Sequence, residues 1–214
     1  MSMHKLFKAL PVAALLALSG AALPVLAQET DAAAAETATT EAPADLSMGV
    51  EAGGIRTKDT AQVNEGYLAD SFEQWELRCI KTEDGKDPCE LFQSLKDDQG
   101  NAVAEFSIFG LPAGGKAAAG GTLMAPLETL LTANLTIQID TAPAKIYPFT
   151  FCTQAGCVAR VGFTAEEVEA FKKGASATVT IVPAVAPDKP VQLAVSLKGF
   201  TAGFDAAAAT VPAP

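Results

Sequence analysis

Between Gly66 and Asp205, apolar residues recur mostly at every second position. A half-buried strand has this period of two, because successive side chains point to opposite faces of a sheet. The stretches with this pattern are Trp75–Cys79, Cys89–Leu95, Ala104–Ile108, Leu123–Pro126, Leu135–Ile139, Tyr147–Phe151, Cys157–Phe163, Val179–Ile181 and Val191–Leu197. We therefore expect roughly seven to nine short strands, joined mostly by tight turns.

Turn-forming residues separate these stretches. Asp84 and Gly85 lie in the polar loop Lys81–Pro88, which predicts a hairpin. Asp97–Asn101 predicts a second turn, and Gly110–Gly121 predicts a mobile loop of glycine and alanine.

One helix is expected after Thr164. Thr164 is a good N-cap, Glu167 completes a capping box, and Gly174 ends the segment. Many strands and one short helix predict a mainly β fold, an antiparallel β-sandwich of jelly-roll-like type.

The first residues have the pattern of a secretory signal. Lys5 and Lys8 form a positive segment, the apolar run Ala9–Leu18 follows, and Ala27 ends a cleavage site of small residues. We expect residues 1–27 to be removed and the protein to be periplasmic or secreted. The apolar run is shorter than the roughly 18 to 20 residues that a membrane helix needs, so we expect no membrane span.

Two flanking segments contain few large apolar side chains, and Gln28 to about Asp45 contains almost none. Residues 28–65 are rich in Ala, Thr and Glu, and residues 206–214 contain mainly Ala, Thr and Pro. Such segments bury too little surface to offset the entropy lost on ordering, so we predict a disordered linker and a disordered tail. The folded domain is placed at residues 66–205.

The charge of the chain excludes several classes of partner. The net charge of −10 becomes about −12 when Lys5 and Lys8 leave with the signal. An acidic surface disfavours nucleic acids and anionic lipids. The only histidine, His4, also leaves, which removes the commonest general base and metal ligand. We expect no cofactor, no metal and no enzyme, although a catalytic Ser–Lys pair is compatible with the sequence.

Four cysteines follow the signal: Cys79, Cys89, Cys152 and Cys157. In an oxidising compartment an even number of cysteines indicates disulfides, and four permit three connectivities. Hairpin geometry favours the local pairs 79–89 and 152–157, each contributing about 2 to 3 kcal/mol. A zinc site and a redox-active pair are the alternatives. The spacings do not match the C-x2-C pattern that both commonly show.

Three further groups carry candidate chemistry. The acidic loop Glu83, Asp84 and Asp87 lacks the ligand pattern of a calcium site and is interpreted as a solvated hairpin tip. The carboxylates of Glu166–Glu169 lie at the start of the expected helix, where its dipole favours negative charge. Tyr147 is the expected ligand contact, since an aromatic ring can stack on a sugar. A periplasmic small-ligand or glycan-binding protein is therefore the alternative function.

Five motifs resemble a known family. They are Phe72–Cys79 (FEQWELRC), Cys89–Leu91, Ile137–Asp140, Pro148–Cys157 and Val195–Phe200. In this order, over about Tyr67 to Phe204, they resemble the invasion-associated locus B proteins. The resemblance implies an exported β-sandwich protein of the Gram-negative envelope without catalytic residues or cofactors. It also implies a link to host-cell invasion. The export signal, the paired cysteines and the missing histidine together favour a protein that acts by contacts with a protein partner in the envelope or on a host cell, including adhesion.

Overall fold

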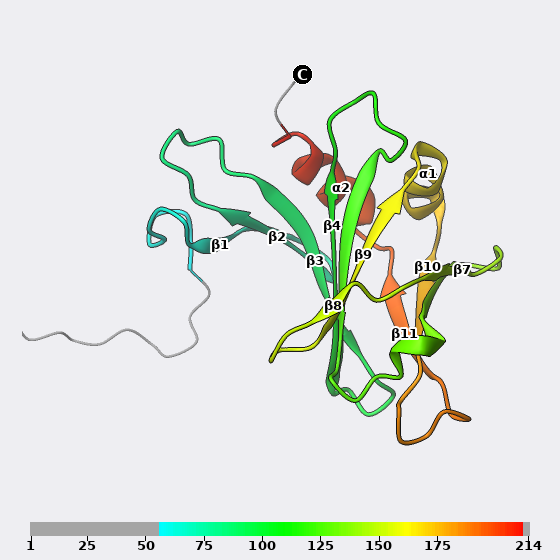
Figure 1. The fold of residues 1–214 in the computed structure, drawn as a ribbon. Helices are drawn as coiled ribbons and strands as arrows, with labels where there is room; N and C mark the ends of the chain where they lie inside the picture. Colours follow the sequence, from blue (N-terminus) through cyan, green and yellow to red (C-terminus); the bar gives the residue numbers. More distant parts are fainter. Residues whose placement is uncertain (1–55, 212–214) are drawn as a thin grey trace, which may run out of the picture. The chain divides into compact units, whose positions relative to one another are not determined.

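The computed structural model describes residues 56–211, which form two antiparallel sheets, two α-helices and one short 3-10 helix (Figure 1). The predicted signal peptide and residues 28–55 of the predicted linker lie outside the described residues. The strands are β1 Gly66–Phe72, β2 Trp75–Ile80, β3 Cys89–Lys96, β4 Ala102–Gly110, β5 Ala119–Ala125, β6 Leu135–Ile139, β7 Lys145–Tyr147, β8 Phe151–Cys152, β9 Cys157–Phe163, β10 Ser176–Ile181 and β11 Val191–Ser196. The helices are α1 Ala165–Lys173, α2 Phe200–Ala208 and the 3-10 turn Leu131–Ala133.

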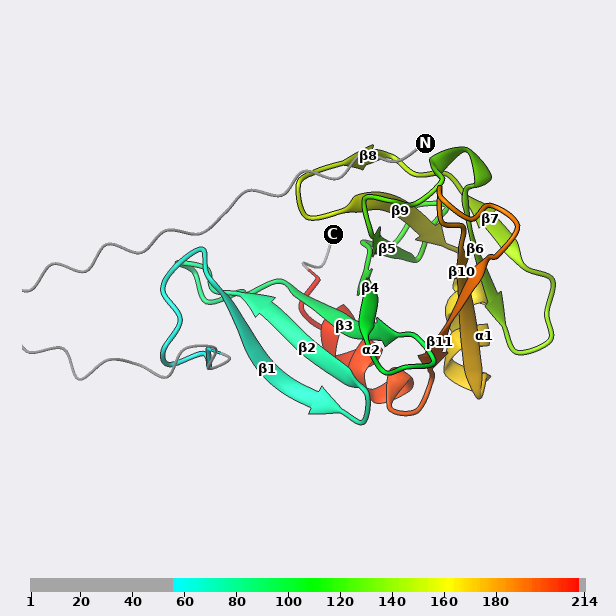
Figure 2. The ribbon, with the colours of Figure 1, turned by 90° about the horizontal axis from the view of Figure 1, so that it is seen from below.

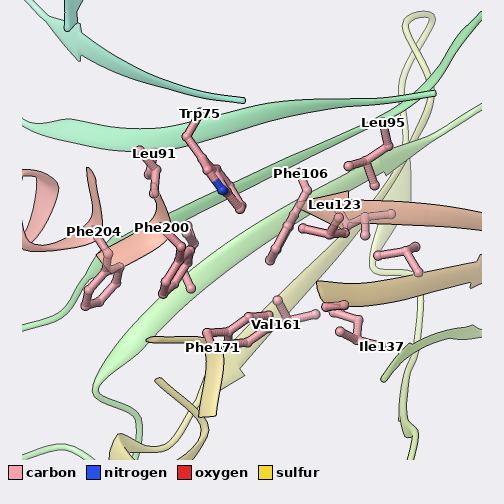
Figure 3. Packing of buried hydrophobic residues seen from close by; sticks show 14 of the residues in the cluster. Trp75, Leu91, Leu95, Phe106, Leu123, Ile137, Val161, Phe171, Phe200 and Phe204 are labelled. Atoms are coloured by element: carbon pink, nitrogen blue, oxygen red, sulfur yellow. The ribbon is translucent and has the colours of Figure 1, made fainter. Parts of the chain in front are cut away.

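The larger sheet has the strand order β1-β2-β3-β4-β5-β9-β8, and the smaller sheet has the order β11-β10-β6-β7. The period-two residues of both sheets meet in one core, with Trp75, Phe106 and Leu193 fully buried. Figure 3 shows the aromatic centre of this core, where Phe171 and Phe200 of the two helices contact the rings from the sheets. The predicted antiparallel β-sandwich is confirmed.

Helix α2 was not expected. Phe200, Gly203, Phe204 and Ala207 are buried on one face of this helix, at the i, i+3, i+4, i+7 spacing of an amphipathic helix. Ala206–Ala208 thus lie in a helix, although they were assigned to the disordered tail. Alanine is the best helix former and is small enough to pack against a sheet, so a composition typical of a tail also suits a helix once Phe200 and Phe204 anchor it.

The ordered chain also begins before Gly66. Ala61 is buried, and the Lys81 ammonium donates hydrogen bonds of 2.8 Å to the carbonyls of Lys58 and Ala61. Residues 56–65 therefore pack on the sheet rather than forming part of a disordered linker. The side chain of Lys81, distant in sequence, fixes a turn that composition alone does not reveal.

Two expected elements have different limits. The run Tyr147–Phe151 is not one strand: Tyr147 belongs to β7 in the smaller sheet and Phe151 to β8 in the larger sheet. The chain crosses between the sheets through Pro148–Thr150. The loop predicted at Gly110–Gly121 is shorter, because Ala119–Gly121 begin β5.

Two seams join the sheets. On one side, Gln93 of β3 pairs with the backbone of Ser196, accepting from its N–H at 2.9 Å and donating to its carbonyl at 3.1 Å. The indole N–H of Trp75 donates to the same carbonyl at 2.7 Å. On the other side, the Tyr147 ring packs edge-on against Phe163 at a centroid distance of 6.1 Å, beside the β7–β8 crossing.

Candidate functional site

Both pairs of cysteines are direct cross-strand neighbours. Cys79 of β2 lies opposite Cys89 of β3, and Cys152 of β8 lies opposite Cys157 of β9. Each pair forms a disulfide, so both predicted local bridges are present. The described chain has no free cysteine, and its sulfur atoms are therefore committed to bridges rather than to a metal.

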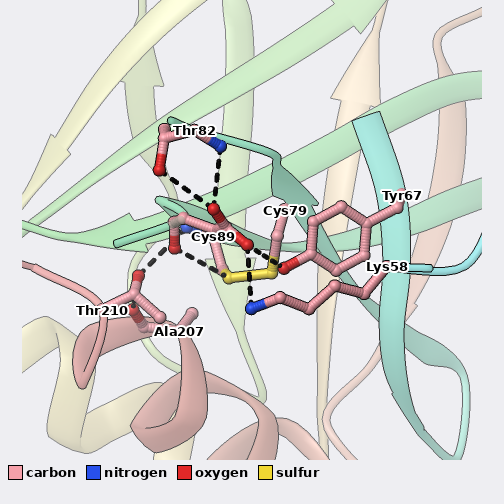
Figure 4. Close-up of a disulfide and its surroundings, with 8 residues drawn as sticks. Lys58, Tyr67, Cys79, Thr82, Cys89, Ala207 and Thr210 are labelled. Carbon is pink, nitrogen blue, oxygen red and sulfur yellow. Dashed lines mark hydrogen bonds and ion pairs between the residues drawn. A yellow bond between two sulfur atoms is a disulfide. The ribbon is translucent and has the colours of Figure 1, made fainter. Parts of the chain in front are cut away.

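A polar cluster centred on the buried side chains of Tyr67 and Asp87 lies beside the Cys79–Cys89 bridge (Figure 4). We call Lys58, Tyr67, Thr82 and Asp87 the Asp87 cluster. One carboxylate oxygen of Asp87 accepts from the Tyr67 hydroxyl at 2.6 Å and forms an ion pair with Lys58 at 3.0 Å. The other oxygen accepts from the Thr82 backbone N–H at 2.8 Å and contacts the Thr82 hydroxyl at 2.9 Å.

The protonation states in this cluster follow from these contacts. The Tyr67 hydroxyl, the Thr82 backbone and Lys58 hold the pKa of Asp87 well below its usual range. Burial, together with hydrogen bonding to Asp87, raises the pKa of Tyr67, and the hydrogen bond to Asp87 raises the pKa of Lys58. At neutral pH Asp87 is therefore ionised and Tyr67 keeps its proton. The carboxylate is engaged on both oxygens and acts as a structural tie.

The C-terminal end of α2 is fastened to the same bridge. The Thr210 hydroxyl accepts from the backbone N–H of Cys89 at 3.0 Å and donates to the Ala207 carbonyl at 2.8 Å. These contacts join α2, the Cys79–Cys89 disulfide and the β2–β3 hairpin into one unit. A substitution in one of the three should therefore affect the other two.

Two clefts adjoin this unit. The first, with a volume of about 710 Å³, has a mostly apolar lining that includes Leu68, Ile80, Phe109 and Leu111. We call these four residues the apolar mouth. The second cleft has a volume of about 960 Å³ and is more polar, with Lys58, Lys86 and Asp87 in its wall. Both volumes suit a small ligand or the side chains of a docked protein.

Two of the charged residues that line the first cleft, Arg78 and Glu76, are paired with each other. The Arg78 guanidinium lies 3.2 Å from the centre of the Phe92 ring and forms an ion pair of 2.8 Å with Glu76. Such a stacked, neutralised arginine adds surface for contact without adding net charge. The first cleft is therefore better suited to apolar contacts than to binding an ion.

Tyr147 lies at a third cleft, of about 460 Å³, between α1 and the β6–β7 hairpin. Its ring is half-buried against Phe163, and its hydroxyl donates a long hydrogen bond of 3.4 Å to Glu167. Partial burial and the negative charge of Glu167 raise the pKa of Tyr147 to about 12. The ring is thus part of the core wall and is only partly accessible to a ligand.

Glu167 has a structural role. It completes the capping box with Thr164 and forms an ion pair of 2.7 Å with Lys145. Partial burial opposes its ionisation, but Lys145 and the Thr164 backbone N–H outweigh that effect and lower the pKa of Glu167. The carboxylate stays charged and holds α1 against β7.

The assignment of Asp87 to a solvated hairpin tip was wrong. Asp84 is exposed and bonds locally to Thr82 and Lys86, but the Asp87 side chain is only 4% exposed. The reason is tertiary: its main partner, Tyr67, lies 20 residues away on β1. No local sequence signal predicts this contact, and Lys58 and Tyr67 were not predicted as site residues. Among the described residues, no cluster of three or more His, Cys, Asp or Glu side chains could hold a metal.

Fold and bridges define the class of this protein: a small antiparallel β-sandwich with two cross-strand disulfides. Over residues 75–208 the chain matches the model of the Invasion associated locus B (IalB) protein family, and it belongs to that family.

Similar proteins are found among curated sequences and solved structures. Two proteins named invasion protein B homolog, from Brucella abortus strain 2308 and from Brucella abortus biovar 1 strain 9-941, are each 32% identical over 139 residues, covering 64% of this chain and 78% of theirs. The crystal structure of invasion associated protein B from Bartonella henselae has the same fold, with a TM-score of 0.54 at 24% identity over 65% of this chain and 94% of that one. Within residues 56–211, neither α-helix has the length and apolar character needed to cross a membrane.

Proposed function

We propose that this protein is exported and acts at the cell envelope through contacts with a protein partner, without catalysis, in host-cell invasion or adhesion. Membership of the invasion-associated family is the observation that carries this proposal. The two disulfides support an oxidising compartment outside the cytoplasm, because bridges persist there and are reduced in the cytosol.

The state of the polar residues favours a role in binding rather than catalysis. Asp87 and Glu167, the two most enclosed carboxylates of the clefts, are ionised and bonded to structural partners. A general acid or base needs a pKa near the working pH and a free path to substrate, and neither group has both. The exposed Ile80 and Leu111 at the apolar mouth provide the surface on which a protein partner would dock.

The proposal is tested by deletion of the gene and complementation. Deletion should lower host-cell adhesion or envelope integrity, and wild-type protein should restore it. The double variant Ile80→Asp/Leu111→Asp should fail to restore it while keeping its disulfides and its melting curve. Val185→Asp is the matched control, because Val185 is also apolar and exposed but lies in the loop between β10 and β11.

Two results would contradict the proposal. One is robust hydrolase activity, or oxidoreductase activity with many turnovers per molecule, from the purified protein. The other is a deletion strain with unchanged adhesion and an unchanged envelope. A pull-down from envelope fractions and from host-cell extracts would then show whether a partner exists in either.

The third cleft favours a second candidate, a periplasmic small-ligand or glycan-binding protein. The partly accessible Tyr147 ring, the Lys145–Glu167 ion pair and an apolar floor together suit a small polar molecule with one apolar side. Tyr147→Phe keeps the ring against Phe163 and removes only the hydroxyl. Binding on a glycan array that Tyr147→Phe weakens would support this candidate, and an array without signal would exclude glycans.

A further inference from the structure

The two disulfides differ in their access to solvent. Cys152 is exposed, whereas Cys157 and Cys79 are 1% and 2% exposed and Cys89 is half-buried. Cys152 lies in β8, a strand of two residues at the outer edge of the larger sheet (Figure 2). The Cys79–Cys89 bridge instead lies within the sheet, between β1 and β4.

This difference matters because a thiolate attacks a disulfide along the line of the sulfur–sulfur bond. Beyond Cys79, that line meets β1, where Tyr67 is the direct neighbour of Cys79 in the register. Beside Cys89 lies Thr210, whose hydroxyl accepts from the Cys89 backbone N–H at 3.0 Å. Beyond Cys152, the described sheet has no further strand. An incoming thiolate can therefore reach the exposed Cys152 from the sheet edge, whereas Tyr67 lies beside Cys79 in the register and the half-buried Cys89 is approached through the two clefts that it lines.

The β8–β9 hairpin does not depend on its disulfide alone. The Thr150 N–H donates to the Val158 carbonyl at 2.7 Å, and the Thr153 N–H donates to the Gly156 carbonyl at 2.8 Å. The Thr150 hydroxyl also accepts from the Arg160 N–H at 3.2 Å. The bridge can thus open in the folded protein, and the hairpin remains paired afterwards.

We propose that Cys152–Cys157 is a thiol-exchange site, reduced in the folded protein by an extracytoplasmic dithiol protein. The first thiolate bonds to the Cys152 sulfur, the Cys152–Cys157 bond breaks, and the Cys157 sulfur leaves as a thiolate that takes up a proton. The second thiolate of the dithiol protein then attacks the first sulfur of that same protein, which is bonded to Cys152 in the mixed disulfide. Cys152 leaves as a thiolate and takes up a proton. The dithiol is oxidised to a disulfide, and the protein gains two thiols. This inference rests on the export that the proposed function includes, but not on its protein partner or its role in invasion.

Selective reduction of the folded protein tests this site. The oxidised protein is incubated with reduced glutathione, or with reduced thioredoxin as a dithiol protein, quenched with iodoacetamide and mapped by mass spectrometry. The Cys79–Cys89 bridge is the internal control. The variants Cys79→Ala/Cys89→Ala and Cys152→Ala/Cys157→Ala, each with a single bridge, assign the two rates independently.

The site predicts that Cys152 and Cys157 are labelled at least about tenfold faster than Cys79 and Cys89. Glutathione should be found on Cys152 rather than on Cys157, and low concentrations of urea should leave the rate unchanged. Equal rates for the two bridges, glutathione on Cys157, or a rate that rises with urea in parallel with global unfolding would each overturn the proposal.

Discussion

At the scale of single residues, buried polar side chains decide how the parts of the domain are joined. Asp87 ties the N-terminal turn, β1 and the β2–β3 hairpin together, and Gln93 ties the two sheets. Leaving such a group without partners in the interior costs more than the bond itself contributes. Each of these residues therefore provides a sharp test of the structure.

The Asp87 cluster predicts a specific pH dependence. Since the pKa of Asp87 is lowered in the folded state, its contribution to stability is complete above the ordinary value of about 3.9, begins to decrease below that value and is lost only when the pH falls through the lowered pKa of the folded state. Asp87→Asn should therefore lower the melting temperature at pH 7, and the difference from wild type should be smaller at pH 3, where part of the contribution is already lost. Thermal unfolding at both pH values measures this.

Asp98→Asn is the control, because it changes an exposed carboxylate in the β3–β4 turn and should leave the melting curve unchanged. An Asp87→Asn effect of equal size at pH 3 and pH 7 would show that the charge of Asp87 does not stabilise the fold.

The Gln93 seam predicts a second substitution effect. Gln93→Leu keeps the volume but leaves the Ser196 N–H without its partner, and it should lower the free energy of unfolding by about 1 to 3 kcal/mol. Urea denaturation measures the loss. Ser94→Ala, at the next and exposed position of β3, should change stability by less than about 0.5 kcal/mol. Equal effects of the two substitutions would contradict the role of Gln93 in the seam.

At the scale of elements, α2 is the largest difference between prediction and structure. Local rules predicted α1, where Thr164 and Glu167 form the expected capping box. They did not predict α2, which lacks a side-chain cap and begins after Gly199, a residue with a φ of +80°. Its helical form depends on packing, since Phe200 and Phe204 are buried beneath the larger sheet.

The contact between α2 and β3 predicts a strict size limit at Gly203. A Cβ atom at this position would lie 2.5 Å from Cδ1 of the fully buried Leu91. Gly203→Ala should therefore destabilise the protein by about 1 to 3 kcal/mol, although alanine favours helices. Thermal or urea unfolding measures the change.

Ala202→Ser is the matched control on the exposed side of the same helix, and it should have little effect. A Gly203→Ala variant that is more stable than wild type would show that α2 does not pack as closely as the structure indicates.

At the scale of the whole molecule, the two disulfides hold different parts of the sandwich. Cys79–Cys89 fixes the hairpin on which the Asp87 cluster and α2 rest, and Cys152–Cys157 anchors the chain where it crosses between the sheets. Their separations of 10 and 5 residues close short loops, so each constrains the unfolded chain only modestly.

Removing each bridge should have a graded effect. Loop entropy predicts a loss of about 3 kcal/mol for Cys79→Ala/Cys89→Ala and about 2 kcal/mol for Cys152→Ala/Cys157→Ala. The first variant should also weaken the contacts of Tyr67 and Thr210, so its loss should be the larger. Urea unfolding of both variants measures this order, and the reverse order would mean that the β7–β8 crossing is the weaker point of the fold.

The strand-rich pattern, the helix after Thr164 and the family could be predicted from the sequence, which also favoured the local pairing of the cysteines. All of these depend on residues close together along the chain, or on motifs that follow one another in the same order as in the family. Only the tertiary structure decided that Asp87 is buried, that Ala206–Ala208 belong to a helix, that Tyr147 faces the core and that Cys152 is the open end of its bridge. The physical reason is the same in each case: burial depends on partners distant in sequence, such as Tyr67 for Asp87 and Leu91 for α2, and no local pattern records which distant residue will be the neighbour.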